Sequence, residues 1–375
     1  MRTIHLPKLL CLFAVIGYFS VNTAQSQLHL PNDGVNYACK AGRKIGLTDI
    51  DIRWNAPGVK GREGKIWGTP VAYYGFSVLG YGSNIPSPWR AGANESTVFS
   101  FTTDVTINGK TLAAGSYGFY IALYPDSCTL IFNKNTAGWG SYFYNSNLDV
   151  LRVSTVQQKD IKESKERLDF TFSKQTAKSV EVALEWEHWR IPFTVEVDLV
   201  KTTLASIKAQ MSSELGFDPP SLQSAADWCL RNNVNEEEAL NWINSAIDPN
   251  LGGVKSFNAL STKAGLLNKM NRKAEAEQVM ATALENASVI EMHGYGRRLL
   301  SEKKNKEALE VFEKNAKKNK GAWPTNAGLM RGYSANGDLK KALEHAKLAL
   351  AQAPDEQNRK ALEEMVKTLS EGKPL

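Results

Sequence analysis

The stretch 96–124, "STVFSFTTDVTINGKTLAAGSYGFYIALY", decides the fold of the first half of the chain. Its side chains alternate between apolar and polar, which is the period of a β-strand with one buried face. Asn108-Gly109 separates two such runs by a two-residue turn, the strongest short-range signal for a tight β-hairpin. The stretch therefore predicts two or three strands in succession.

The same period extends over residues 35–200. Runs such as "DIDIRWNAP" (49–57) and "ERLDFTFSKQ" (166–175) recur at regular spacing, with Gly and Pro between them and without a long helical pattern. About nine short strands of this kind predict a β-sandwich. In "LEWEHWRIPFTVEVDL" (184–199) we expect one long strand, with Trp186 and His188 on one face, Trp189 on the other, and a bulge or sheet edge at Pro192.

The period becomes helical after Val200. Residues 201–218 read as a helical connector, and Pro219-Pro220 begin a new segment. Ala239, Ala274, Ala308 and Ala342 then recur at a spacing of roughly 34 residues, the length of a helix–turn–helix repeat in which a small residue lets two helices approach closely. The last unit matches the tetratricopeptide pattern at Tyr333, Gly337, Ala342, Ala349 and Pro354.

The fold class predicted is therefore α+β multidomain: an N-terminal all-β sandwich over residues 35–200 and a C-terminal α-helical, tetratricopeptide-like solenoid. The solenoid contains about four repeats over residues 219–370. Stacked helix pairs of this type share one core and leave a concave surface free.

Residues 1–26 have the pattern of a secretory signal peptide. Arg2 and Lys8 precede an apolar run from Leu9 to Phe19, and Ala24 and Ser26 form an A-x-S motif that predicts cleavage after Ser26. We expect a periplasmic or secreted protein that meets the membrane only through the removed peptide; an uncleaved membrane anchor is the alternative.

Charge and motifs exclude several function classes. The net charge of +6 is dispersed along the chain, so nucleic acid is not an expected partner. The sequence lacks a G-x-S-x-G elbow and a phosphate-binding P-loop. Its five histidines are scattered, without the spacing of a zinc site. No cofactor and no metal site are predicted.

Cysteine usage leaves two alternatives open. Cys39, Cys128 and Cys229 remain after removal of the predicted signal peptide. In an oxidising compartment Cys39 and Cys128 could pair and leave Cys229 free. The other alternative is three buried, unpaired thiols.

The candidate ligand site lies in aromatic-rich loops of the first half. Arg90 offers a rigid five-donor fork for a carboxylate or phosphate group, and Trp rings beside polar groups suit sugar stacking. The candidate binding residues are Lys65, Trp89, Arg90, Asn94, Glu95, Asn133, Lys134 and Trp139. We expect Arg90, Glu95 and Asn133 to face one hollow.

A structural role is the alternative for the same loop. Arg90 could pair with Glu95 or Glu187, Gly92 could supply a turn with positive φ, and Asn94 could tie the backbone. A hydrolase is a further alternative, in which Glu95 acts as general acid or base, with Glu185 or Glu187 as its partner and Arg90 as the stabiliser of negative charge.

Several long motifs resemble one bacterial family, catalogued as domain of unknown function 2911. They are "VKGREGKIWG" (59–68), the segment from "WRAGANE" through Tyr120, "LIFNKNTAGWGSYFYNSNLDVLRV" (130–153) and "LEWEHWRIPFTVEV" (184–197). The resemblance covers about residues 40–200 and implies an exported envelope protein of Gram-negative bacteria. Positions that match its motifs are Lys65, Trp67, Trp89, Arg90, Gly92, Asn94, Glu95, Asn133, Lys134, Trp139, Gly140, Trp186 and Arg190.

The resemblance implies no activity, because the family is named for lacking one. Some members carry a helical-repeat tail similar to residues 220–370. Residues 71–88 depart from the family as an insertion that lengthens one rim of the candidate site.

Together these features favour an exported envelope binding and scaffold protein over an enzyme and leave the question of catalysis open. Its β-domain would bind a glycan or peptide, and its repeats would bind a protein partner. The alternatives are an envelope glycosidase or esterase-like hydrolase, and an inert β-module with all function in the repeats.

Overall fold

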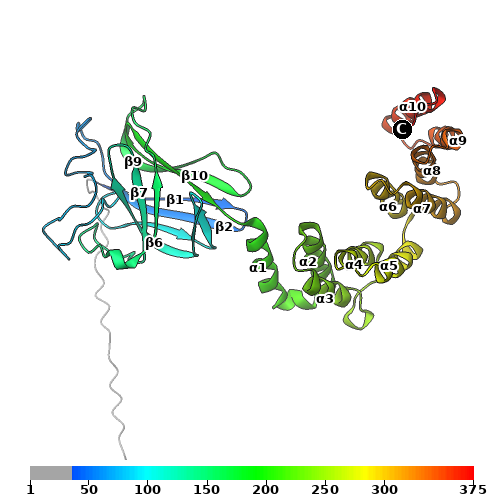
Figure 1. Ribbon diagram of the computed structural model, residues 1–375, viewed down its shortest axis with the longest axis horizontal. Coiled ribbons are helices and arrows are strands. Elements are labelled where there is room, and N and C mark those ends of the chain that lie inside the picture. Colours follow the sequence, from blue (N-terminus) through cyan, green and yellow to red (C-terminus); the bar gives the residue numbers. More distant parts are fainter. Residues whose placement is uncertain (1–35) are drawn as a thin grey trace, which may run out of the picture. The chain divides into compact units, whose positions relative to one another are not determined.

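The computed structural model describes residues 36–375, which form two compact units, the first with the strands to Glu196 and the second with the helices from Val197 (Figure 1). The strands are β1 (Tyr37–Ile45), β2 (Thr48–Ala56), β3 (Thr97–Phe101), β4 (Val105–Ile107), β5 (Lys110–Leu112), β6 (Gly115–Leu123), β7 (Cys128–Asn133), β8 (Asp149–Thr155), β9 (Lys165–Ser173), β10 (Ser179–Glu187) and β11 (Trp189–Glu196). The α-helices are α1 (Leu199–Met211), α2 (Pro219–Asn232), α3 (Glu236–Ala246), α4 (Phe257–Lys269), α5 (Lys273–Asn286), α6 (Val289–Ser301), α7 (Asn305–Lys318), α8 (Trp323–Ala335), α9 (Leu339–Ala351) and α10 (Glu356–Ser370), with short 3-10 helices η1 (Ser146–Leu148), η2 (Glu214–Phe217) and η3 (Pro249–Leu251).

The strands form two sheets that pack face to face. Their orders are β1-β2-β3-β6-β7-β8 and β5-β4-β11-β10-β9. Phe99 of β3 is fully buried, and its ring centroid lies 5.4 Å from that of Phe170 and 5.8 Å from that of Phe193. Because both partners belong to the other sheet, the core lies between the sheets, and the predicted sandwich is confirmed.

Local turn chemistry fixes the β4–β5 hairpin. Asn108 (φ 43°) and Gly109 (φ 82°) both adopt positive φ between the paired residues Ile107 and Lys110. A two-residue turn with both central residues at positive φ matches the right-handed twist of the strands that it joins. The predicted hairpin at Asn108-Gly109 is confirmed.

The segment 184–199 is two strands and not one. The chain reverses at Glu187-His188, with Glu187 at φ 52°, so that Trp186 pairs directly with Trp189. Directly paired residues lie on the same face of a sheet. The predicted assignment of Trp186 and Trp189 to opposite faces is therefore wrong, because a turn separates them. Pro192 lies where β11 pairs with β10 alone, as β4 reaches only Val195 and Glu196.

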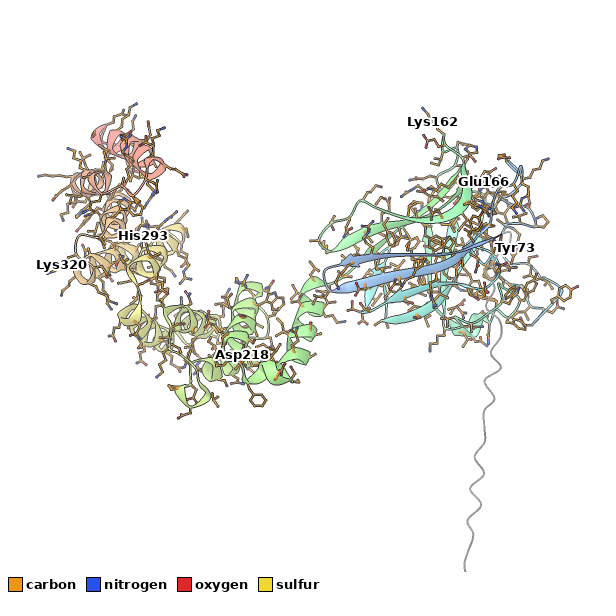
Figure 2. The ribbon with its side chains drawn as sticks, turned by 180° about the vertical axis from the view of Figure 1, so that it is seen from behind. Tyr73, Lys162, Glu166, Asp218, His293 and Lys320 are labelled. Atoms are coloured by element: carbon orange, nitrogen blue, oxygen red, sulfur yellow. The ribbon has the colours of Figure 1, made fainter. Side chains whose placement is uncertain are left out.

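The helical unit begins with the connector α1 and η2 and continues with packed helix pairs. Asp218 accepts a hydrogen bond from Ser221 N at 2.9 Å and so caps α2, which starts with Pro219 and Pro220 (Figure 2). Helices α2–α3, α4–α5, α6–α7 and α8–α9 form successive pairs, and α10 packs on α9.

Each pair has a buried alanine at the same place in its second helix. Ala239, Ala276, Ala308 and Ala342 are at most 1% exposed, and each donates its N–H to the N-cap carbonyl one helical turn earlier. The predicted Ala274 is exposed, so that assignment is wrong by two positions. The buried alanines are unevenly spaced along the sequence, since the loops between helices differ in length.

Phe312 of α7 fills a space left by three glycines. A Cβ at Gly296 or at Gly328 would lie 2.4 Å from the Phe312 ring, and one at Gly332 would lie 2.9 Å from it. A glycine inside a helix costs about 1 kcal/mol relative to alanine. The fully buried ring offsets this cost and joins α6, α7 and α8 into one core.

Cys39, Cys128 and Cys229 are free thiols, as in the second of the two alternatives for the cysteines. Only Cys128 and Cys229 are buried; Cys39 is partly exposed, so the prediction of burial is wrong for it. Burial raises the pKa of Cys128 to about 12, and the positive charge of Lys159 opposes this shift. In the part of the chain that the structure describes, no helix is long and apolar enough to cross a bilayer. The predicted signal peptide lies outside the described residues.

We expect Phe312→Ala to lower the free energy of unfolding of the helical unit by about 3–5 kcal/mol, because a large cavity replaces the ring. Urea unfolding followed by far-UV circular dichroism measures the loss. Phe217→Ala is the matched control: Phe217 is 85% exposed, and its removal should change stability by less than about 0.5 kcal/mol. Equal effects of the two changes would contradict the core described here.

Candidate functional site

Long loops gather at one end of the β-sandwich, where Tyr73 lies (Figure 2). Strand β3 pairs with β6 only as far as Phe119. Beyond that point the loop 57–96 pairs with β6 in place of β3. Trp89 forms an antiparallel bridge with Ile121, and Gly75 N donates to Leu123 O at 2.7 Å. The insertion-like residues 71–88 are therefore fastened along the edge of β6.

Arg90 projects from this fastened segment. Its Nη1 donates to Asn94 O at 3.2 Å, and its guanidinium carbon lies 5.3 Å from the centroid of the Tyr142 ring. Gly140 leaves room for it, because a Cβ there would lie 2.4 Å from the guanidinium carbon. Burial raises the pKa of Tyr73 and of Tyr120, and the positive charge of Arg90 opposes both shifts.

The turn between Arg90 and Glu95 differs from the one predicted. Positive φ occurs at Ala91 (48°) and Asn94 (54°), and not at Gly92. Gly92 is needed for space, because a Cβ there would lie 2.7 Å from Thr97 Oγ1, which itself donates to Ala91 O at 3.0 Å. The prediction of a positive φ at Gly92 is wrong because close packing, and not backbone angle, selects glycine there.

Glu95 is exposed and ends a chain of side-chain amides. Asn55 Nδ2 donates to Glu95 Oε2 at 2.6 Å, Asn94 Nδ2 donates to Asn55 Oδ1 at 3.4 Å, and Asn36 Nδ2 donates to Asn94 Oδ1 at 3.1 Å. Neither Glu95 nor Glu187 forms an ion pair with Arg90 within the described chain. Glu187 is buried and accepts a hydrogen bond from Gly64 N.

Arg90 and Glu95 line different hollows. Arg90, Asn94 and Trp89 line a hollow of about 380 Å³ together with Lys60, Arg62 and Trp186. Glu95 lines a second hollow of about 460 Å³ with Trp54, Arg53 and Cys39. The expectation that the two groups face one hollow is therefore wrong: Asn55 holds the carboxylate on the other side of the turn.

The remaining predicted residues are scattered. Asn133 is 1% exposed and fully engaged, donating to Asn145 O at 2.9 Å and to Asp149 Oδ1 at 2.6 Å, so it ties β7 to the loop that follows. Lys65, Lys134 and Trp139 are exposed. Their role in binding stays a prediction.

Four tryptophans from three segments form one cluster that the sequence did not predict. Trp67 stacks on Trp189 at 4.5 Å and meets Trp89 and Trp186 edge-on at 5.6 and 5.9 Å. Trp89 and Trp186 are parallel at 6.2 Å. The unrecognised β10–β11 turn hid this cluster, because it brings Trp186 and Trp189 to one face.

Lys60 and Arg62 are the other residues that sequence reasoning missed. They lie in "VKGREG", where two glycines at positive φ, Gly61 and Gly64, let the chain turn so that Lys60 and Arg62 line the same hollow as Arg90. Two cations in a glycine-rich loop were the available signal. No group of three or more His, Cys, Asp or Glu residues suited to a metal occurs in residues 36–375.

Residues 38–195 match the family model described as "Protein of unknown function (DUF2911)". The resemblance expected from the motifs is confirmed for the β-domain, and the match assigns it no activity. No curated protein gives a significant match to the chain.

Solved structures match over part of the chain. MamA (residues 41 to the end) from Desulfovibrio magneticus RS-1 is 19% identical, with a TM-score of 0.27 over 41% of this chain and 93% of its own. YrrB, described as a TPR protein with an unusual peptide-binding site, is 16% identical, with a TM-score of 0.27 over 44% of this chain and 91% of its own. The assignment of helical repeats rests on the helix pairs themselves.

We expect Gly140→Ala to destabilise the β-domain more than Gly61→Ala. Both glycines have positive φ (58° and 71°), so both changes cost about 1–2 kcal/mol in the backbone. Only the Cβ at position 140 would meet Arg90, whereas the space around Gly61 is open within 4 Å. Thermal unfolding measures the difference. Equal destabilisation would show that Arg90 does not pack on Gly140.

Proposed function

We propose that this is an exported envelope protein that binds two kinds of molecule. The β-domain binds a small polar ligand in the loops around Arg90, and the helical repeats bind a protein partner. Export is inferred from the signal-peptide pattern that ends at Ser26. The binding roles are inferred from the surfaces of the two units.

One observation carries the partner-binding role: polar side chains of three first helices converge on two adjoining hollows. A hollow of about 250 Å³ lies between α4 and α6, and one of about 300 Å³ lies between α2, α4 and α6. Both are lined by Asn258, Ser261 and Arg298. First helices of stacked pairs commonly line the surface that holds a partner polypeptide.

Arg298 is the central side chain of this groove. Its Nη2 donates to Ser261 Oγ at 3.2 Å, and its guanidinium carbon lies 4.9 Å from the centroid of the Tyr295 ring. No carboxylate of the described residues forms an ion pair with it. An arginine held by a hydroxyl and an aromatic ring keeps donors for a partner's carbonyl or carboxylate groups.

The hydrolase alternative gains no support from the positions of its residues. Glu95 is bonded to Asn55 and lines another hollow than Arg90. Glu185 accepts from Arg190 Nε at 3.1 Å and pairs with Lys165. Paired carboxylates acting on one substrate need to face each other across it.

The partner-binding role predicts that Arg298→Ala removes the proteins that the full-length chain captures by cross-linking from an envelope extract. Lys347→Ala on α9 is the control, since this exposed lysine lies on a second helix and its loss removes the same charge. Quantitative mass spectrometry compares the captured proteins. Retention of every partner by Arg298→Ala would contradict the proposed groove.

A further inference from the structure

The hollow around Arg90 is strongly basic. Three cationic residues, Lys60, Arg62 and Arg90, line it together with Asn94, Trp89 and Trp186. None of the residues that line it is an acid. Like charges that converge on one hollow raise each other's energy unless an anion is present to offset them.

The two arginines are held in place without a carboxylate. Arg62 Nε donates to Val59 O at 2.9 Å and its Nη2 donates to Gly58 O at 2.7 Å. Arg90 is held by Asn94 O and the Tyr142 ring. Backbone carbonyls therefore orient both guanidinium groups while several of their five donors each stay available. Within residues 36–375, no ion pair involves Lys60, Arg62 or Arg90.

Three acids of the adjoining segments have other hydrogen-bond partners. Glu166 accepts a hydrogen bond from the backbone N–H of Lys60 at 3.2 Å, and Glu187 accepts one from Gly64 N. Glu95 is turned toward the second hollow by Asn55. None of these three carboxylates therefore occupies the side-chain donors of Lys60, Arg62 or Arg90.

Two tryptophans also line the same hollow, with most of their surface covered by the protein. Trp186 is 1% exposed and Trp89 is 3% exposed, and their rings are parallel. The Trp186 indole N–H is buried without a hydrogen-bond partner in the described residues, which is uncommon for a buried donor. A hollow of about 380 Å³ has the size of a site for a small organic molecule.

We propose that this hollow binds a small, ring-sized organic anion whose carboxylate or phosphate group is held by Lys60, Arg62 and Arg90, with its less polar face toward Trp89 and Trp186. The inference refines the proposed function of the β-domain, on which it rests, by naming the class of ligand. Guanidinium groups match both carboxylate and phosphate geometry, so either group satisfies the site.

Isothermal titration calorimetry of the chain beginning at residue 27 tests this with four probes: glucose 6-phosphate, galacturonate, glucose and inorganic phosphate. We expect at least one of the two charged sugars to bind and glucose not to bind. Affinity should fall with added salt, because the contact is electrostatic. Binding of only one charged sugar identifies the preferred group. Failure of both would overturn the proposal, and equal affinity for inorganic phosphate would overturn the role of the indoles.

Variants locate the site. Arg62→Gln and Lys60→Gln should each weaken binding by about tenfold or more, since each removes a charged contact to the anion. The Lys60 side chain forms no ion pair in the described chain, so Lys60→Gln should fold normally. Lys162→Gln is the control: it removes the same charge from an exposed loop outside the hollow (Figure 2). Equal affinities of Lys60→Gln and Lys162→Gln would overturn the assignment.

The result is separable from that for the helical repeats. Anion binding is measured with the pure protein, whereas the partner is measured by cross-linking with Arg298→Ala. If anion binding is absent, the cross-linking result for Arg298→Ala is unaffected, and the reverse also holds.

Discussion

The turn between Arg90 and Glu95 is the constraint on which the candidate site depends. Ala91 and Asn94 hold left-handed backbone angles, and the Asn94 carbonyl accepts from the guanidinium that precedes it. Left-handed angles at non-glycine residues persist only where surrounding contacts over-determine them. Here the contacts are the Gly92 packing against Thr97 and the amide chain through Asn55. The result is a cation on one side of the turn and a carboxylate on the other.

The separation of Arg90 from Glu95 determines the charge of the hollow in the β-domain. A joined Arg90–Glu95 pair would neutralise itself and leave a structural loop. Because Arg90 is separated from Glu95, it lines one hollow together with Lys60 and Arg62. Trp89 and Trp186 line the same hollow. Three cationic residues and no acid line it, so the hollow carries a net positive charge. The tryptophan cluster stabilises this arrangement, since rings from three segments pack where β10 turns into β11. The helical unit contributes a separate polar groove around Arg298.

Local rules predicted much of the fold. Asn108-Gly109 specifies its hairpin by backbone angles alone, and alanines about 34 residues apart revealed the helix pairs. The errors arose where distant contacts decide. Ala276 is buried in the helix pair and Ala274 is exposed. The regular spacing in the sequence favoured Ala274, which was the wrong choice. Glu95 faces away from Arg90 because Asn55, on β2, bonds it. Lys60 and Arg62 line the same hollow as Arg90 through the tertiary fold, although they are about thirty residues away in the sequence.

A double-mutant cycle between Arg90 and Glu95 tests the central claim, the separation of these two charges, most directly. The free energy of unfolding is measured for Arg90→Gln, Glu95→Gln, the double variant and the unchanged protein. The account predicts a coupling energy below about 1 kcal/mol, because Arg90 and Glu95 are linked only through Asn94 and Asn55 and not by direct contact. A favourable coupling above about 1 kcal/mol would mean that the two groups form an ion pair, and would contradict a separate anion-binding hollow.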